Sequence, residues 1–276
     1  MTAPLLVRGA RQLLTLRGSV EPRRGSRMRE LGVIEEGSLL IAGETIVEAG
    51  ATRRVVNLAR ARGANVVDAS GCVVLPGFVD PCMDLLGHTP TLLAIERRTA
   101  LLLEHGTTTI GCATAVRKYR HLFKKARAAL VDVVRLEQES SQPAALVKPL
   151  ANLLAGTVAI RPREYIDGGR ALALATGFDA ASIRSCSMQA AIALACLQMN
   201  LTIEEAISAA TTNAAHLLGI GRIAGALEPD RQADAVLLQV PDYRQIPYHF
   251  GVNLVRTVIK RGKIVYQRGD RWWMGS

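Results

Sequence analysis

A short apolar run interrupted by a Pro-Gly pair constrains this chain more than any other feature. The run reads Val73-Val74-Leu75-Pro76-Gly77-Phe78-Val79-Asp80-Pro81 and is followed by Cys82-Met83-Asp84. Side chains alternate between the two faces of a strand, so Cys82 and Asp84 point the same way. A thiolate and a carboxylate can both bind a divalent metal, but a protein site needs a third ligand, and the sequence identifies none. We therefore expect no metal ion at Cys82 and Asp84.

Strand-like and helical segments occupy different parts of the chain. The strand-like pieces are 5–7, 37–41, 45–47, 66–67, 73–74, 235–238 and a hairpin through 260–263. Between them, residues 188–199 are apolar almost all round, which indicates a buried helix. Thr202 and Glu205 form a capping box for a second helix, predicted over 203–218, and Gly219 suits its C-terminus. These patterns predict an α/β protein with β pieces at both termini.

Composition places the chain among compact globular proteins. Its 276 residues are 49% hydrophobic with a mean hydropathy of +0.18, which is enough to bury a sizeable core. No apolar run reaches the roughly 18 residues of a membrane span, and residues 1–10 lack the layout of a signal peptide. The five cysteines are odd in number and show no Cys-x-x-Cys spacing. We therefore expect a cytoplasmic protein with reduced thiols and no membrane partner.

The basic charge invites a nucleic-acid hypothesis. The formal net charge is +10 and the isoelectric point is near 9.8. The densest basic cluster, 117–127, falls within a helix that the apolar spacing predicts over 116–137. Few aromatic residues interleave these charges, so a solvated helix face is favoured over a nucleic-acid surface. Nucleic-acid binding stays a third alternative, which would show as a steep dependence of affinity on salt.

Several motifs of the second half follow one another in the order of a known family. They are 171–179 (Ala-Leu-Ala-Leu-Ala-Thr-Gly-Phe-Asp), 211–215 (Thr-Thr-Asn-Ala-Ala), 225–229 (Gly-Ala-Leu-Glu-Pro), 232–234 (Gln-Ala-Asp) and 247–253 (Pro-Tyr-His-Phe-Gly-Val-Asn). Together with Pro-Gly-Phe-Val-Asp at 76–80, they resemble the imidazolonepropionases, the amidohydrolases that open the imidazolone ring in histidine degradation. The resemblance implies a TIM-like (β/α) barrel beside a small β-sandwich that both termini build.

The length of the middle region implies an incomplete barrel. The resemblance assigns 1–79 with 225–276 to the composite β-sandwich domain and 80–224 to the barrel domain. The barrel domain then has about 145 positions, whereas a complete (β/α)₈ barrel needs at least about 200. The resemblance places the seventh strand near 153–158 and the last strand at 171–179. We therefore expect the third to sixth strands to be absent.

The resemblance also locates the positions at which the family carries its chemistry. Two metal-binding histidines belong at the first barrel strand, where this chain has Cys82 and Asp84, and a catalytic aspartate belongs at the last, where it has Gly177. Asp179 lies two residues farther on, a displacement of about 6–7 Å along a strand. A misplacement of even about 1 Å can lower the rate of an enzyme a hundredfold. We therefore expect no catalytic residue, with Asp179 the nearest substitute for Gly177.

Two hypotheses for the function follow. The first is a catalytically degenerate homologue, a pseudoenzyme without a cofactor that serves as a structural or regulatory partner, as a homo-oligomer or with another protein. The alternative is a working, metal-dependent hydrolase of a cyclic C–N bond, most plausibly an imidazolonepropionase with zinc or iron, which would need metal ligands from a partner chain or a changed mechanism. Stoichiometric metal in the purified protein would favour the alternative.

Overall fold

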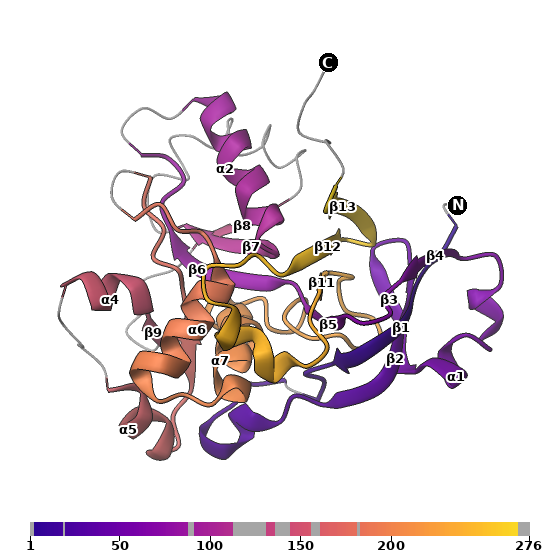
Figure 1. Ribbon diagram of the computed structural model, residues 1–276, viewed down its shortest axis with the longest axis horizontal. Coiled ribbons are helices and arrows are strands. Elements are labelled where there is room, and N and C mark those ends of the chain that lie inside the picture. Colours follow the sequence, from indigo (N-terminus) through magenta and orange to yellow (C-terminus); the bar gives the residue numbers. More distant parts are fainter. Residues whose placement is uncertain are drawn as a thin grey trace.

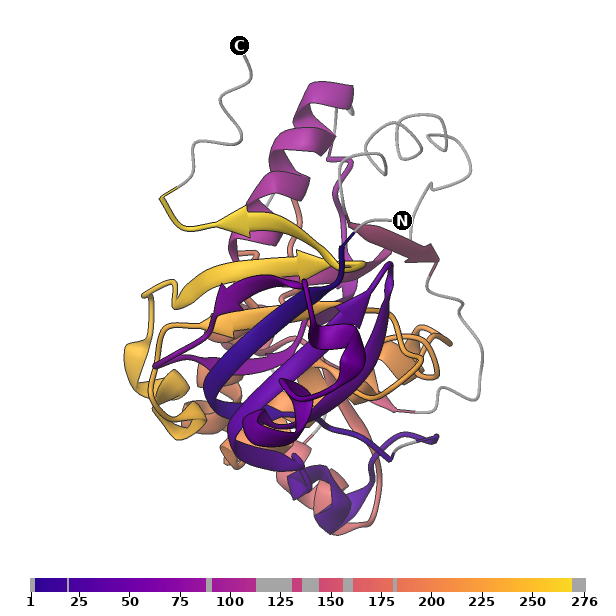
Figure 2. The same ribbon diagram turned by 90° about the vertical axis from the view of Figure 1, so that its right-hand side faces the viewer.

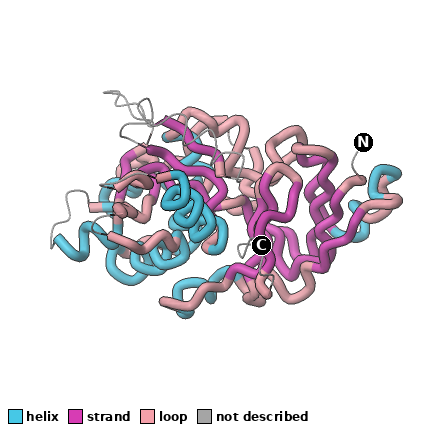
Figure 3. Tube along the Cα trace, turned by 90° about the horizontal axis from the view of Figure 1, so that it is seen from above, coloured by secondary structure: helices cyan, strands magenta, loops and turns pink. Residues whose placement is uncertain are grey.

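The computed structural model describes residues 3–18, 20–87, 91–112, 131–135, 144–155, 161–180 and 183–269. A large sheet stands at one side of the molecule, and shorter strands surrounded by helices stand at the other (Figure 1 and Figure 3). Within the described ranges, no helix is long and apolar enough to cross a membrane.

The large sheet joins strands from both ends of the chain. Its strands are β1 (Leu5–Leu14), β2 (Val33–Ala42), β3 (Thr45–Ala51), β4 (Asn65–Asp68), β5 (Val73–Pro76), β11 (Ala235–Leu238), β12 (Val255–Lys260) and β13 (Lys263–Gln267). They are ordered β13-β12-β11-β5-β1-β2-β3, with β4 beside β1. The antiparallel pairing of β5 with β11 sets Val73 opposite Leu238, and Figure 2 shows the yellow C-terminal strands alongside the indigo and purple N-terminal ones. This confirms the composite sheet expected from the resemblance.

Near β1 and β2, apolar side chains are buried on both faces of this sheet. The connection between β3 and β4 contains α1 (Thr52–Val55) and η2 (Ala59–Ala61). Leu6 and Leu40 pack with Val55 of α1 in one cluster, whereas their chain neighbours Val7 and Leu39 belong to a separate core. The alternation is that of a strand with both sides covered.

In the described part of the barrel region, the chain forms five short parallel strands. They are β6 (Phe78–Met83), β7 (Thr107–Cys112), β8 (Asp132–Arg135), β9 (Ala145–Val147) and β10 (Leu172–Leu174). β7 pairs with β6 and β8, β9 pairs with β10, and a parallel bridge between Asp84 and Asp179 links the two groups. The order is therefore β8-β7-β6-β10-β9, and no described residues pair β8 with β9. This arrangement confirms the incomplete TIM-like barrel.

The helix predicted over 116–137 is wrong at its C-terminal end. Residues 132–135 form β8, because the β-branched pair Val133 and Val134 fits a strand beside β7. A third parallel strand is thus present, contrary to the expectation that the third strand is absent. Most of the predicted helix, with the basic cluster 117–127, lies outside the described residues.

The strand predicted near 153–158 is also misplaced. The chain there contains α4 (Pro149–Ala155), and the strand that pairs with β10 is β9, which ends at Val147. Pro149 cannot donate to a strand ladder, but its fixed φ suits the first turn of a helix. The Lys148-Pro149 pair therefore ends the strand and starts the helix, and residues 156–160 lie outside the described ranges.

Helices surround the barrel strands. The remaining helical elements are η1 (Gly25–Arg29), α2 (Leu92–Glu104), α5 (Pro162–Asp167), α6 (Met188–Met199), α7 (Ile203–Ala210), α8 (Thr212–Leu217) and η3 (Tyr243–His249). The helix expected over 203–218 is divided at Thr211, whose φ of −130° and ψ of −91° are not helical. The capping box of Thr202 and Glu205 is confirmed, because the hydrogen bonds run in both directions.

β10 is buried on both faces, as expected for a strand of a parallel sheet. Leu172 and Leu174 belong to the large core that also contains residues of α6 and α7. Ala171 and Ala173 instead pack in a second cluster with Ala214 and its neighbours in α8. Helices therefore cover this part of the shortened barrel on two sides.

Candidate functional site

The predicted site residues lie at the carboxyl ends of β6 and β10, where parallel α/β folds place their functional groups. The Asp84 amide donates to the Phe178 carbonyl at 2.8 Å, and the Ala180 amide donates to the Asp84 carbonyl at 3.3 Å. These bonds flank the bridge between Asp84 and Asp179. Cys82 lies within β6 and is half-buried. The fold thus brings Asp84 and Asp179 together through their backbones.

One carboxylate oxygen of Asp84 accepts a hydrogen bond from a nearby backbone amide. Its Oδ1 accepts a hydrogen bond from the Leu86 amide at 2.8 Å, which is an Asx-type turn. Cys82 also uses its backbone amide locally, donating to Oδ1 of Asp80 at 3.3 Å. Both residues therefore help to shape the strand end.

Asp80 is a buried carboxyl of this region, and nothing in the Pro-Gly-Phe-Val-Asp motif distinguishes it as a site residue. Its side chain is fully buried. Oδ2 accepts hydrogen bonds from the Thr176 hydroxyl and, at 3.2 Å, from the Thr176 amide. Burial raises the pKa of Asp80 to about 6, although the bonds from Thr176 and Cys82 and the positive charge of Lys148 act in the opposite direction. Full burial keeps this carboxyl away from any substrate in the mouth of the barrel.

Gly177 is covered by the side chain of Lys148, a contact that the sequence did not indicate. Lys148 follows β9 and is half-buried. A Cβ atom at position 177 would lie 3.3 Å from Cδ and 3.4 Å from Cβ of Lys148, and 3.6 Å from Cβ of Ala151. Gly177 also has a φ of +70°, which L-residues with side chains rarely adopt. A larger residue at 177 would therefore be strained and tightly packed.

A cysteine–histidine contact joins the C-terminus of α2 to the segment that precedes α6. Sγ of Cys186 is 3.8 Å from Nδ1 of His105, which also contacts the Leu101 carbonyl at 2.9 Å. The latter contact caps the C-terminus of α2. Burial raises the pKa of Cys186 to about 12, so this thiol stays protonated and cannot serve as a nucleophile at neutral pH. Sequence analysis missed the pair because the two residues are far apart along the chain.

The side chains at these strand ends do not fit a metal ion. Across the described part of the chain, no group of three or more His, Cys, Asp or Glu residues is placed to hold one. Asp80 is closed off by its hydrogen bonds to Thr176 and Cys82, and position 177 offers no side chain. Cys82 and Asp84 alone do not complete a site, since protein metal sites need at least three ligands.

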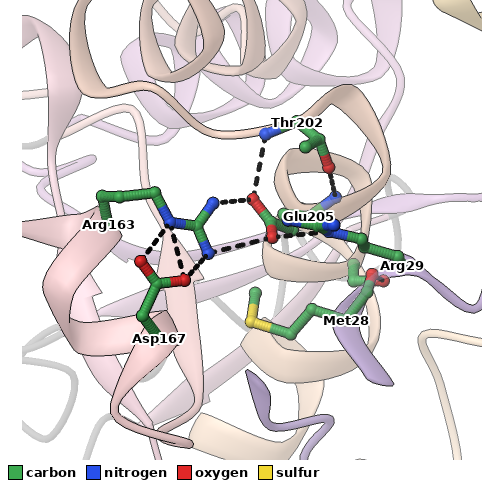
Figure 4. Close-up of polar contacts among 7 residues, drawn as sticks. Met28, Arg29, Arg163, Asp167, Thr202 and Glu205 are labelled. Atoms are coloured by element: carbon green, nitrogen blue, oxygen red, sulfur yellow. Dashed lines mark hydrogen bonds and ion pairs between the residues drawn. The ribbon is translucent and has the colours of Figure 1, made fainter. Parts of the chain in front are cut away.

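The most densely hydrogen-bonded carboxylate, Glu205, lies elsewhere and is structural. Figure 4 shows Arg163 from α5 and Arg29 from η1 converging on Glu205 of α7. Arg163 donates to both carboxylate oxygens at 2.8 and 3.2 Å, Arg29 donates at 3.0 Å, and the Thr202 amide donates at 2.9 Å. Arg163 also pairs with Asp167 at 2.7 Å. These ion pairs and hydrogen bonds link η1 and α5 to the N-terminus of α7.

A second ion network, centred on Lys260, joins β8 to the large sheet. Lys260 is 3% exposed, and its Nζ lies 2.7 Å from Oδ2 of Asp132 and 2.5 Å from Oδ2 of Asp234. Arg261 adds an ion pair to Asp132 at 2.8 Å, and Gln232 donates to both carboxylates at 2.9 and 2.7 Å. β8, a strand that the sequence did not predict, therefore contacts the composite sheet through ion pairs and hydrogen bonds.

Sequence comparisons place the chain among amidohydrolases. The model of the Amidohydrolase family matches residues 83–265. The imidazolonepropionase of Geobacillus kaustophilus is 27% identical over 418 alignment positions, which take in 96% of this chain and 99% of that protein. Because this chain has only 276 residues, about a third of that alignment has no counterpart in it. The imidazolonepropionase of Bacillus velezensis is 44% identical over 108 residues, 39% of this chain and 26% of that protein.

A structural comparison supports the same fold. The guanine deaminase of E. coli superposes with a TM-score of 0.72 at 14% sequence identity, covering 97% of this chain and 100% of that chain. At this identity the likeness concerns the fold alone. It agrees with the incomplete barrel and the composite sheet described above.

Proposed function

This chain belongs to the amidohydrolase family, and we propose that it is a catalytically degenerate, imidazolonepropionase-like member that acts as a structural or regulatory partner. The observation that carries the proposal is the set of side chains at the strand ends. Gly177 lies under the stem of Lys148, and the buried Asp80 is closed off by Thr176. Among the residues that the structure describes at these strand ends, Cys82 and Asp84 are left, and two ligands are too few to hold a metal. We further propose that 1–79 with 225–276 and 80–224 are its two domains.

Asp179 is a poor substitute for a catalytic base in this arrangement. It follows β10 two residues after Gly177, and its backbone amide donates to the Ile183 carbonyl at 2.8 Å. A general base must reach the proton it abstracts to within about 3 Å. Asp179 lies two residues beyond the position where the family carries its aspartate, and a misplacement of even about 1 Å can lower the rate of an enzyme a hundredfold.

We expect purified protein to carry far less than one zinc or iron ion per chain. The reason is the set of metal-binding side chains at the strand ends, where the described residues offer Cys82 and Asp84 no third ligand. Elemental analysis of the full chain, with the Cys82→Ala/Asp84→Ala variant as a control, tests this expectation. One metal ion per chain in the wild type that is lost in the variant would contradict it.

We also expect no measurable hydrolysis of imidazolonepropionate. Restoring a carboxylate by Gly177→Asp should not produce activity, because the new side chain meets Lys148 and the backbone there has a positive φ. A spectrophotometric ring-opening assay with added zinc or iron measures both proteins. Wild-type turnover within the usual range of about 1–1000 per second would refute the proposal.

The alternative is an active, metal-dependent hydrolase of a cyclic C–N bond. The observation that favours it is the 44% identity to the imidazolonepropionase of Bacillus velezensis over 108 residues. Such an enzyme would need zinc or iron ligands from a partner chain. Metal analysis and the ring-opening assay on one sample distinguish the two hypotheses, because the alternative requires both to be positive.

We expect the chain to associate with itself or with a partner protein through its open barrel edges. Among the described strands, β8 pairs only with β7 and β9 pairs only with β10, so each leaves one edge without a neighbour. Unpaired strand edges favour association with another chain. The segment 247–253 offers a second contact, because Tyr248 and Phe250 are 87% and 55% exposed. Light scattering tests this, and a clean monomer at high concentration with no partner recovered from extract would count against it.

A further inference from the structure

An open pocket lies beside β3 of the large sheet, at the end of the molecule opposite the barrel strands (Figure 1). Its walls come from the last residue of β3, from α1 and from the turn that follows α1, and its volume is about 530 Å³. The residues that line this α1 pocket are Ala51, Arg53, Arg54, Asn57 and Leu58. Pockets that hold small molecules usually have volumes of about 300–1,000 Å³. The α1 pocket is therefore large enough for a small ligand, and it is separate from the strand ends described above.

The segment that forms the α1 pocket is strongly basic. Residues 49–67 contain four exposed arginines, at positions 53, 54, 60 and 62, and neither Asp nor Glu. Arg54 forms an ion pair with Glu48 of β3 at 2.6 Å. No described residue forms a hydrogen bond or an ion pair with the guanidinium of Arg53. Because a guanidinium stays protonated at neutral pH, the pocket carries a positive charge that the protein itself does not compensate.

α1 is fixed on the sheet beside this pocket. Val55 is completely buried and packs with Leu6 of β1 and Leu40 of β2. The guanidinium of Arg54 lies over Gly50, since its Nε and Nη2 atoms are 3.4 Å from the place that a Cβ atom would take there. A side chain that is already held in position loses less conformational freedom when a ligand binds. The pocket therefore presents at least one guanidinium in a defined place.

We propose that the α1 pocket binds the phosphate group of a small phosphorylated molecule. The planar fork of a guanidinium donates two parallel hydrogen bonds to phosphate oxygens, and two arginines match the double negative charge of a phosphate monoester. Ala51 and Leu58 supply apolar surface for the carbon part of such a ligand. A nucleic-acid strand fits less well, because residues 49–67 contain no aromatic side chain on which bases could stack. This binding is additional to the proposed function and does not depend on whether the barrel is active.

Isothermal titration calorimetry of the full chain with phenyl phosphate, at low ionic strength and with EDTA present, tests the proposal. We expect a dissociation constant below about 1 mM for the wild type. Arg53→Gln/Arg54→Gln should weaken binding at least about 10-fold, because it removes both forks. The matched control, Arg60→Gln/Arg62→Gln, removes the same charge from the same segment but outside the pocket, and it should weaken binding less than about 3-fold. Arg53→Lys keeps the charge without the fork and should fall between the two double variants.

Equal losses in the two double variants would mean that diffuse positive charge alone attracts the probe, and the proposal would be wrong. Absence of binding to the wild type, or equally tight binding of benzoate, would overturn it as well. A short single-stranded oligonucleotide that binds more tightly than phenyl phosphate, with a steep dependence on salt, would identify a nucleic-acid site instead. Urea unfolding of each variant separates lost binding from lost folding. If the double variant does not fold, Arg53→Gln replaces it, and unchanged binding in that variant overturns the proposal.

Discussion

Replacing Glu205 by Ala is expected to lower the free energy of unfolding by about 1.5–3 kcal/mol, because it removes charge-assisted hydrogen bonds from two arginines that are themselves partly exposed. The Glu205 side chain is completely buried and accepts four hydrogen bonds, three of them from Arg163 and Arg29. Its loss leaves both guanidinium groups without their shared acceptor. It also removes the Glu205 half of the capping box of α7, the bond from the Thr202 amide, whereas the bond from the backbone amide of residue 205 to the Thr202 hydroxyl can remain.

The control for Glu205 is another acidic residue that pairs with an arginine on the surface. Glu164 lies 3.0 Å from Arg161, but both side chains are largely exposed, and such pairs contribute at most about 1 kcal/mol. Urea unfolding of Glu205→Ala and Glu164→Ala should therefore separate the two variants clearly. Equal and small effects would show that the network contributes little to stability.

The Glu205 network should also make the protein sensitive to acid. Burial opposes ionisation, but the hydrogen bonds from Arg163, Thr202 and Arg29 outweigh it and lower the pKa of Glu205 below its ordinary 4.5. A carboxyl with a lowered folded-state pKa stabilises the fold above its unfolded pKa, and this contribution is lost as pH falls through the folded-state value. The difference in unfolding free energy between wild type and Glu205→Ala should thus be full near pH 7 and shrink below about pH 4.5.

The contacts of Glu205 show which interactions can be predicted from the sequence and which cannot. The capping box of Thr202 and Glu205 could be predicted, because a Ser/Thr-x-x-Glu spacing acts within one turn of helix. Arg29 and Arg163 could not, because they lie 176 and 42 residues away from Glu205 and meet it only in the folded chain. Local signals therefore gave the helix start, whereas the energetically larger contacts depend on tertiary structure.

The residues at the strand ends show the same distinction between local sequence signals and contacts that depend on the tertiary structure. Alternation along β6 could predict that Cys82 and Asp84 share a face, and motif order could place Gly177 near them. The cover that Lys148 forms over Gly177 has no signature in the sequence, since it arises from the pairing of β9 with β10. β9 itself was missed because a three-residue strand has too few residues for its period to be recognised.

Replacing Lys260 by Met is expected to destabilise the fold by about 3–5 kcal/mol, because it leaves two carboxylates without their common cation in a buried site. Lys260 is buried between Asp132 and Asp234, which also share Gln232 as a donor. Burial opposes the ionisation of Asp132, but Lys260, Gln232 and Arg261 together outweigh this effect and lower the pKa of Asp132. Without the ammonium, Asp132 and Asp234 repel each other across a short distance, and only Arg261 still forms an ion pair with Asp132.

The location of Lys260 gives this prediction a second, local readout. Asp132 is the first residue of β8, while Lys260 ends β12 of the composite sheet, 128 residues away in the chain. Among the described strands, β8 pairs only with β7, so the ion network around Lys260 is its main contact with the large composite sheet. Hydrogen exchange at the amides of 132–135 should therefore accelerate in Lys260→Met beyond what global destabilisation explains.

The triple variant Lys260→Met/Asp132→Asn/Asp234→Asn should regain part of the lost stability, because it removes the repulsion between the carboxylates as well as the cation. If Lys260→Met unfolds like the exposed-site variant Lys263→Met, then β8 is held by its strand pairing alone and the charge network is dispensable.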